Sequence, residues 1–243
     1  LREAWTPGEE PAAETLADFL TGALDGYCEG RNRPVYVSTS RLSPHLRFGE
    51  IGPRQIWHAT RSAIESGEAR AGSSDAEKFL SEIGWREFSY HLLFYNPELA
   101  TQNYNRRFDA FPWRRDDDAL SAWQRGLTGY PIVDAGLREL WATGWMHNRV
   151  RMITASFLIK HLLIDWRQGE EWFWDTLVDA DPANNAASWQ WVAGSGADAA
   201  PYYRIFNPVT QGLKFDPKGG YVRHWVPEIA GLDDALIHEP WTA

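Results

Sequence analysis

The residues best suited to chemistry stand together in one stretch, Asp179 to Trp191, with the sequence DADPANNAASWQW. Two carboxylates and two amides supply hydrogen-bonding groups, and the small residues 186–188 would let a bulky partner approach the backbone. Trp189 and Trp191 add two large flat indoles. This composition is typical of one wall of a pocket for a planar, hydrogen-bonding ligand of the nucleotide kind. Composition alone leaves open a second interpretation, a polar turn between core helices with the tryptophans as core residues.

A second candidate site is the hydroxyl-rich run TSRLSP, Thr39 to Pro44. Ser43 followed by Pro44 predicts a helix start, with Ser43 as N-cap and Pro44 at the first helical position. Hydroxyls, backbone N–H groups and the Arg41 guanidinium at a helix N-terminus would suit a phosphate group. A capping site without a ligand explains the same residues, so this run alone does not decide between the two.

A third candidate lies on the long helix that the sequence predicts over Ser74 to Tyr95. Glu82, Trp85 and Ser89 are spaced i, i+3 and i+7 and therefore share one face of that helix. A carboxylate and an indole on one face would bind the edge of a base and stack on it. A core tryptophan beside a salt-bridged glutamate would give the same spacing.

The composition indicates one large domain with an aromatic-rich interior. The chain has 243 residues, among them 14 tryptophans, 9 tyrosines and 11 phenylalanines, enough for a substantial core. Its net charge of −9, taken over the whole chain, argues against nucleic acid as a partner. Basic residues nevertheless gather in four places, which allows a basic face on an acidic protein: residues 31–33, 41–54, 106–115 and 149–151.

Several other classes of protein find no support in the sequence. The single cysteine, Cys28, excludes an internal disulfide and a cysteine metal cluster, and it fits a reducing, cytoplasmic setting. No run of about 18 apolar residues predicts a membrane span, and the N-terminus has no signal pattern. Because it also lacks an initiator methionine, we expect a fragment or a processed form. There is no Ser-His-Asp order, HExxH, P-loop or GxGxxG motif, and the histidines lack ligand spacing, so no metal site is expected.

The periodicity of the chain predicts a mainly α fold in a single domain. Helices are expected over residues 11–24, 53–66, 74–95, 117–126, 132–143, 147–164 and 170–178, with Gly67 as a C-terminal glycine after the second. Asn148 and Met152 share a face of the sixth helix, whereas a lone His147 is typical of a structural residue. After Trp191 the segment PYYRIFNPVTQG predicts short turns broken by proline.

Six segments together resemble the FAD-binding domain of the photolyase/cryptochrome family, most closely the bacterial cyclobutane pyrimidine dimer branch. They are TSRLSPHLRFGEI, FLSEIGWREF, GYPIVDAGLREL, TGWMHNRVRMITASFLIKHLLIDWRQGE, DADPANNAASWQW and APYYRIFNPVTQGLKFD, in the family's order and spacing. The resemblance implies a multi-helix domain over residues 1–243, with 1–24 as a lead-in helix and interdomain connection and 25–240 as the core. It also implies that the family's N-terminal α/β antenna domain is absent from this chain, and with it the site for a folate- or deazaflavin-type pigment. The chain ends at Ala243, short of the family's usual C-terminal end.

The same resemblance implies FAD, active in its reduced form and bound in a folded-back conformation. Asn185, rather than Asn184, would face flavin N5, because it stands four residues after Asp181. Arg151 would pair with Asp179 beside the flavin ring. The full set of cofactor residues implied is Tyr27, Thr39, Ser40, Arg41, Leu42 and Ser43 at the diphosphate, Phe79 and Arg86 elsewhere in the pocket, and Arg151, Asp179, Ala180, Asp181 and Asn185 at the ring and ribose.

A lesion-binding set and an electron route follow from the resemblance as well. The residues implied to contact the lesion or its flanking phosphates are Glu82, Trp85, Arg86, Ser89, Asn148, Arg149, Met152, Trp191 and Gln211. Trp189, Trp166 and Trp113 match the family's electron-transfer chain from flavin to surface. With Asn185 and Glu82, these three tryptophans are the expected catalytic residues.

The function implied is light-driven repair of cyclobutane pyrimidine dimers in UV-damaged DNA by a monomer that does not bind membranes. A cryptochrome photoreceptor is one alternative, but plant-type cryptochromes carry an acid where this chain has Asn185. Repair of (6-4) photoproducts is another, but those relatives place two histidines where this chain has His147 followed by Asn148. Phe79 replaces a frequent tryptophan, and PANNAAS differs from the commoner glycine-containing version, which suggests a subgroup distant from the best-known bacterial enzymes.

Overall fold

The computed structural model describes residues 4–199 and 205–242, and its regular structure there is helical. The helices are α1 (Glu9–Thr21), α2 (Tyr27–Gly30), α3 (Ser43–Phe48), α4 (Pro53–Ser66), α5 (Ser73–Tyr95), α6 (Asp117–Gln124), α7 (Pro131–Thr143), α8 (Asn148–Ser156), α9 (Trp166–Thr176), α10 (Asn184–Ala193), α11 (Pro208–Phe215) and α12 (Gly220–Trp225). Four short 3-10 or π segments complete them: Arg106–Ala110, Phe157–His161, Pro227–Ile229 and Pro240–Thr242. The prediction of a mainly α fold is confirmed.

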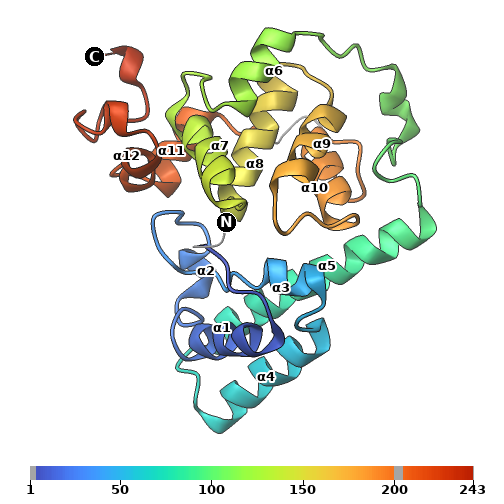
Figure 1. Cartoon of the computed structure of the whole chain (residues 1–243), viewed down its shortest axis with the longest axis vertical. Helices are drawn as coiled ribbons and strands as arrows, with labels where there is room; N and C mark the ends of the chain where they lie inside the picture. Colours follow the sequence, from blue (N-terminus) through green and yellow to red (C-terminus); the bar gives the residue numbers. More distant parts are fainter. Residues whose placement is uncertain (1–3, 200–204, 243) are drawn as a thin grey trace.

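The helices form two groups joined by α5 (Figure 1). Helices α1 to α4 lie at one end of the molecule, α6 to α12 lie at the other, and α5 runs obliquely along the boundary. Each group has its own cluster of buried apolar side chains, one from α1, α3, α4 and α5 and a larger one from α6 to α10 and α12. A site between the groups therefore rests on two packed cores.

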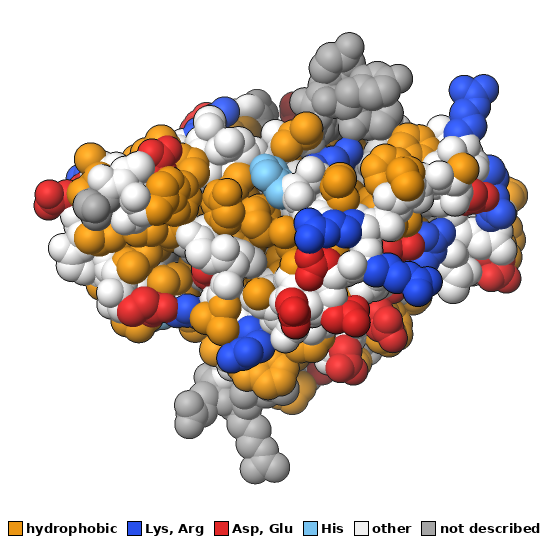
Figure 2. Space-filling model, turned by 90° about the horizontal axis from the view of Figure 1, so that it is seen from above, with side chains coloured by type: hydrophobic (Ala, Val, Ile, Leu, Met, Phe, Trp, Pro, Cys, Tyr) orange, Lys and Arg blue, Asp and Glu red, His pale blue; other side chains and the backbone are white. Residues whose placement is uncertain are grey.

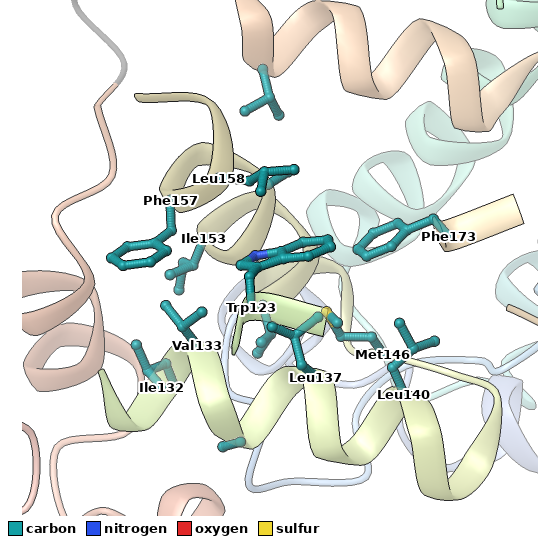
Figure 3. Close-up of a cluster of buried hydrophobic side chains, with 14 of the residues drawn as sticks. Trp123, Ile132, Val133, Leu137, Leu140, Met146, Ile153, Phe157, Leu158 and Phe173 are labelled. Carbon is teal, nitrogen blue, oxygen red and sulfur yellow. The ribbon is translucent and has the colours of Figure 1, made fainter. Parts of the chain in front are cut away.

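Trp123 of α6 lies at the centre of the larger core (Figure 3). Its indole is fully buried, stacks on Phe173 with ring centroids 6.2 Å apart, and donates a hydrogen bond from Nε1 to the Thr154 carbonyl at 3.0 Å. Leu137 and Met146 pack from below in the same view. This core fixes α8, α9 and α10, which line the candidate site, relative to one another.

Most expected helices are present, with shifted ends. Helix α4 has the predicted bounds and ends at Gly67. The helix expected over 147–164 instead ends at Ser156 and continues as a π-helical turn, Phe157–His161. The helix expected over 170–178 begins earlier, at Trp166, because the Asp165 side chain accepts a hydrogen bond from Arg167 N at 3.1 Å and caps it there.

One prediction about local structure was wrong, and one helix was not predicted. Ser43 is not the N-cap of α3: Arg41 has a left-handed φ of 52°, Leu42 is the N-cap, and the helix begins at Ser43 itself. The residues after Asp181 are helical from Asn184, which the sequence interpretation had not assigned. Part of the predicted turn segment, residues 201–204, lies outside the described residues; directly after it, residues 208–215 form α11.

Within the described residues, no helix is both long enough and apolar enough to cross a membrane.

Candidate functional site

A cavity of about 690 Å³ lies where the two groups of helices meet. It is lined by residues from α2, the loop before α3, α5, α8, α9, α10 and the α9–α10 connection. All thirteen residues predicted for the cofactor line it: Tyr27, Thr39, Ser40, Arg41, Leu42, Ser43, Phe79, Arg86, Arg151, Asp179, Ala180, Asp181 and Asn185. Tyr27 and Asn185 are 158 residues apart in the sequence, and the fold brings both to this cavity.

One ion pair is built into the wall of this cavity. Arg151 of α8 donates from Nη2 to Asp179 Oδ2 at 2.8 Å and from Nε to the Met146 carbonyl at 2.7 Å. The Asp179 side chain is only 2% exposed, and its other oxygen, Oδ1, is buried without a hydrogen-bond partner among the described residues. A buried carboxylate oxygen at a cavity wall calls for an N–H or O–H donor from a ligand.

Asp181 lines the same cavity but its oxygens are engaged by the protein. Oδ1 accepts hydrogen bonds from Ala183 N at 3.0 Å, Asn184 N at 2.7 Å and Asn184 Nδ2 at 2.9 Å. Oδ2 accepts one from the Tyr90 hydroxyl of α5. The carboxylate thus satisfies backbone donors at the start of α10, which is why the helix begins there. That Asp181 also contacts the cofactor stays a prediction.

Asn185 is buried at the start of α10 with its amide orientation determined by α9. Its Nδ2 donates to the Glu170 carbonyl and to Glu170 Oε1, both at 3.0 Å. Both amide hydrogens are therefore used, and the carbonyl oxygen remains as an acceptor. Burial raises the pKa of the Glu170 carboxyl. Asn184 also lines the cavity and donates from Nδ2 to Asp181 Oδ1, so the choice of Asn185 as the residue that faces the ligand stays a prediction.

Cationic and aromatic groups also line the cavity. The Arg41 guanidinium lies 4.4 Å from the centre of the Trp145 ring, and Arg47 of α3 donates from Nε to the Ala180 carbonyl. Tyr27 is buried against Phe19 and Phe79, and burial raises the pKa of its hydroxyl to about 12. Guanidinium groups beside Thr39 to Ser43 give the composition of a phosphate site.

The predicted face of α5 also lines the cavity. Glu82 accepts from Arg31 and forms an ion pair with Lys78 at 2.9 Å, while the Trp85 residue remains 52% exposed. Ser89 is buried, and its hydroxyl donates to the Trp85 carbonyl at 3.1 Å. Across from α5, the cavity is lined by Asn148, Met152 and Trp191. An exposed indole and a carboxylate thus lie at the same cavity as the residues implied for the cofactor.

Comparisons with known proteins agree with this geometry. The family model described as the FAD binding domain of DNA photolyase matches residues 79–243, more than half of the chain. The chain belongs to this family. A deoxyribodipyrimidine photo-lyase of Agrobacterium fabrum is 61% identical over 241 residues, which are 99% of this chain and 50% of that protein. Cryptochrome-1 of Arabidopsis thaliana is 43% identical over 248 residues, 100% of this chain and 36% of that protein.

Among solved structures, a bacterial class III photolyase from Agrobacterium tumefaciens superimposes with a TM-score of 0.95 at 61% identity. The match covers 100% of this chain and 49% of that one. The chain thus spans about half the length of the photolyases that it matches. FAD is the cofactor of this domain family, and the cavity fits it: the orphaned Asp179 oxygen, the Asn185 carbonyl and the arginine-rich end lie around one space.

Two residues predicted for lesion contact in this photolyase domain lie outside the cavity lining. The Arg149 guanidinium lies 4.4 Å from the centre of the Phe215 ring of α11 and donates a hydrogen bond to Asn32 Oδ1. Arg149 therefore connects α8 to α11 and to the loop after α2. Gln211 belongs to α11, and its Oε1 is buried without a described partner. Direct lesion contact by either residue stays a prediction.

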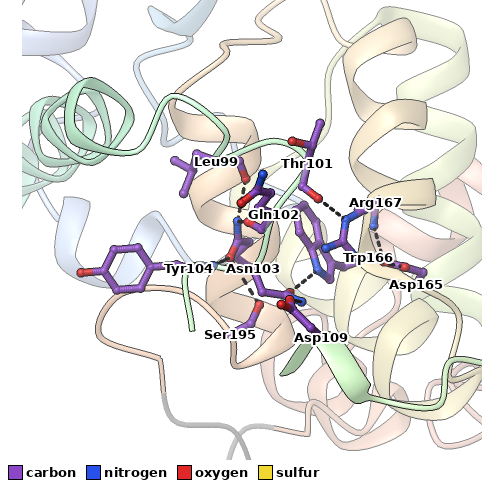
Figure 4. A network of polar contacts seen from close by, with 11 residues as sticks. Leu99, Thr101, Gln102, Asn103, Tyr104, Asp109, Asp165, Trp166, Arg167 and Ser195 are labelled. Carbon is purple, nitrogen blue, oxygen red and sulfur yellow. Dashed lines mark hydrogen bonds and ion pairs between the residues drawn. The ribbon is translucent and has the colours of Figure 1, made fainter. Parts of the chain in front are cut away.

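The three predicted electron-route tryptophans occupy different depths. Trp189 lines the cavity, Trp166 is fully buried, and Trp113 is half-buried against Phe111 at 4.3 Å between ring centroids. Trp166 Nε1 donates to Asn103 Oδ1 at 3.0 Å within a polar network shown in Figure 4. Their role as an electron route stays a prediction.

Sequence reasoning missed several residues that hold the site together. Glu170, Tyr90 and Asn103 bond to Asn185, Asp181 and Trp166 respectively. Each pair joins different helices or loops, so no local spacing signals it. His147, which the sequence predicts to be structural, caps α8: its Nδ1 accepts a hydrogen bond from Arg149 N, and burial, with nearby arginines, lowers its pKa to about 3.

Proposed function

We propose that this chain is the cofactor- and lesion-binding half of a photolyase that repairs cyclobutane pyrimidine dimers in DNA under light. One observation carries the proposal: a single cavity of about 690 Å³ is lined both by the cofactor set and by Glu82, Trp85, Asn148, Met152 and Trp191. When bound and reduced, FAD supplies an electron that light makes available. The remaining work, which is to bind, orient and shield the substrate, belongs to the residues of this chain.

The lesion would enter the cavity as an extruded dinucleotide. A pyrimidine dimer stacks poorly in the duplex, so turning it out costs less than turning out a normal base. Trp85 and Trp191 supply apolar walls, and Glu82 supplies a carboxylate that only accepts hydrogen bonds. Its accepting character suits the imide N–H groups of an intact dimer. Asn148 supplies an amide that can both donate and accept.

Charge at the cavity supports a DNA substrate despite the net charge of −9. The face seen in Figure 2 carries basic and acidic side chains next to one another. The cavity itself is lined by five arginines, namely Arg31, Arg41, Arg47, Arg86 and Arg151. Local cations of this kind attract phosphates even on an acidic protein.

The test is a spectrum followed by a repair assay. We expect the purified protein, supplied with FAD, to retain flavin and, after chemical reduction, to remove cyclobutane dimers from an oligonucleotide in blue light but not in the dark. An oligonucleotide with a (6-4) photoproduct should be unchanged. Flavin binding without repair would favour a cryptochrome-like photoreceptor, and failure to bind flavin would overturn the proposal altogether.

Replacing Glu82 by Ala should weaken binding of dimer-containing DNA by about 1–3 kcal/mol, because the imide donors would lose their acceptor in a partly dry cavity. The flavin content should stay unchanged. The measurements are lesion-DNA affinity and single-turnover repair, with Glu77→Ala, an exposed acid on the same helix, as control. If Glu82→Ala matches the parent protein in both, Glu82 is a structural partner of Arg31 and Lys78 only.

A further inference from the structure

The Arg41 guanidinium lies beside two indole rings. Its central carbon is 4.4 Å from the ring centre of Trp145 and 5.9 Å from that of Trp5. Within residues 4–199 and 205–242, no carboxylate forms an ion pair with it. A guanidinium placed against aromatic faces keeps its N–H donors for another partner. Arg41 therefore lies at the cavity with its donors available to an anion.

Trp5 reaches this position from the segment that precedes α1. Its Nε1 donates to the Thr143 carbonyl at 2.8 Å, a contact across 138 positions of the chain. Thr143 is the last residue of α7, where helix carbonyls lack partners within the helix. Trp5 thus caps the C-terminal end of α7, and Trp145 stands two residues after that end.

The backbone of Arg41 has a left-handed conformation, so contacts of its side chain are needed to hold the residue in place. Its φ of 52° is unfavourable for a residue with a side chain, so local preference alone does not hold it. Trp145 is buried and belongs to the α7–α8 connection, and Trp5 belongs to the N-terminal segment. The guanidinium is therefore placed by contacts from two distant parts of the chain.

We propose that Trp5 is a positioning residue for the FAD diphosphate, acting through Arg41. The segment that leads into the domain is then part of the cofactor site, and a change in that segment changes FAD affinity. This inference rests on the proposed placement of the diphosphate at Arg41.

The test is a double-mutant cycle on FAD affinity, measured as Kd by flavin fluorescence with the full chain. Trp5→Ala should weaken FAD binding about five- to tenfold, the range expected for losing one partly exposed cation–π contact. Arg41→Ala should weaken it further, and Trp5→Ala should add nothing in the Arg41→Ala background, because the two changes remove one interaction. Trp57→Ala, which removes a 45% exposed tryptophan of α4 outside the cavity lining, should leave Kd unchanged.

Three outcomes would overturn the inference. The first is that Trp5→Ala binds FAD as tightly as the parent. The second is that the loss of FAD affinity in Trp5→Ala multiplies fully with that of Arg41→Ala, which would mean that Trp5 acts through general stability. If the parent binds no FAD, the proposed function fails and the inference with it, so the two failures are distinguishable. Should Trp5→Ala not fold, Trp5→Leu keeps apolar bulk without an aromatic face and serves as the same test.

Discussion

Replacing Asp179 by Ala is expected to abolish FAD retention through gel filtration and to lower the stability of the cofactor-free protein. The change removes the partner of Arg151 from a cavity wall, and with it the buried Oδ1 acceptor that has no hydrogen-bond partner among the described residues. Breaking a buried ion pair costs about 3–5 kcal/mol, and we expect about 2–4 kcal/mol here because the Arg151 side chain keeps 24% exposure. The measurements are the ratio of flavin to protein absorbance and thermal unfolding with and without FAD.

Two variants separate the ligand effect from the effect on the fold. Asp179→Asn keeps the size of the side chain and removes its charge, so it should retain more stability than Asp179→Ala and still bind FAD weakly. Asp175→Ala removes an exposed acid from the nearby α9 and should behave as the parent. FAD retention by Asp179→Ala equal to that of the parent would show that this carboxylate does not contact the cofactor.

The sequence was informative wherever the signal was local. Helix α4 has proline and glycine at its ends and was predicted with the correct bounds, whereas α10 was missed. Its start depends on Asp181, whose carboxylate accepts donors from residues 183 and 184, and on Tyr90 of α5, which holds that carboxylate. A capping group fixed by a distant residue leaves no periodic pattern to detect.

The site was predictable as a set of residues but not as a network. The resemblance placed thirteen cofactor residues, and all of them line one cavity. It said nothing of Glu170, which orients Asn185, or of Trp5, which lies beside Arg41. These contacts depend on how α9 packs against α10 and on where the N-terminal segment runs, which only tertiary structure determines. For the same reason, Arg149, which the resemblance implied as a lesion contact, is bonded to Asn32 and does not line the cavity.

Replacing Trp189 by Phe should nearly abolish light-driven reduction of bound oxidised flavin while leaving repair by the chemically reduced protein largely intact. Trp189 lines the cavity and packs on the backbone of α9 so closely that a Cβ added at Gly169 would lie 2.2 Å from its Cη2. It also contacts Phe173 at 5.0 Å between ring centroids. A phenyl ring fits this space and loses the readily oxidised indole. The stability cost of the smaller ring should be about 1–2 kcal/mol.

The measurement is the rate of flavin absorbance change under blue light with an external thiol, compared with dimer repair after chemical reduction. Trp123→Phe is the matched control, because Trp123 is equally buried and lies 6.2 Å from Trp189 between ring centroids without lining the cavity. It should keep photoreduction even though it loses at least as much stability, because the Thr154 carbonyl also loses its buried donor, and this separates electron supply from packing. Photoreduction that proceeds unchanged in Trp189→Phe would mean that electrons reach the cofactor by a route that avoids Trp189.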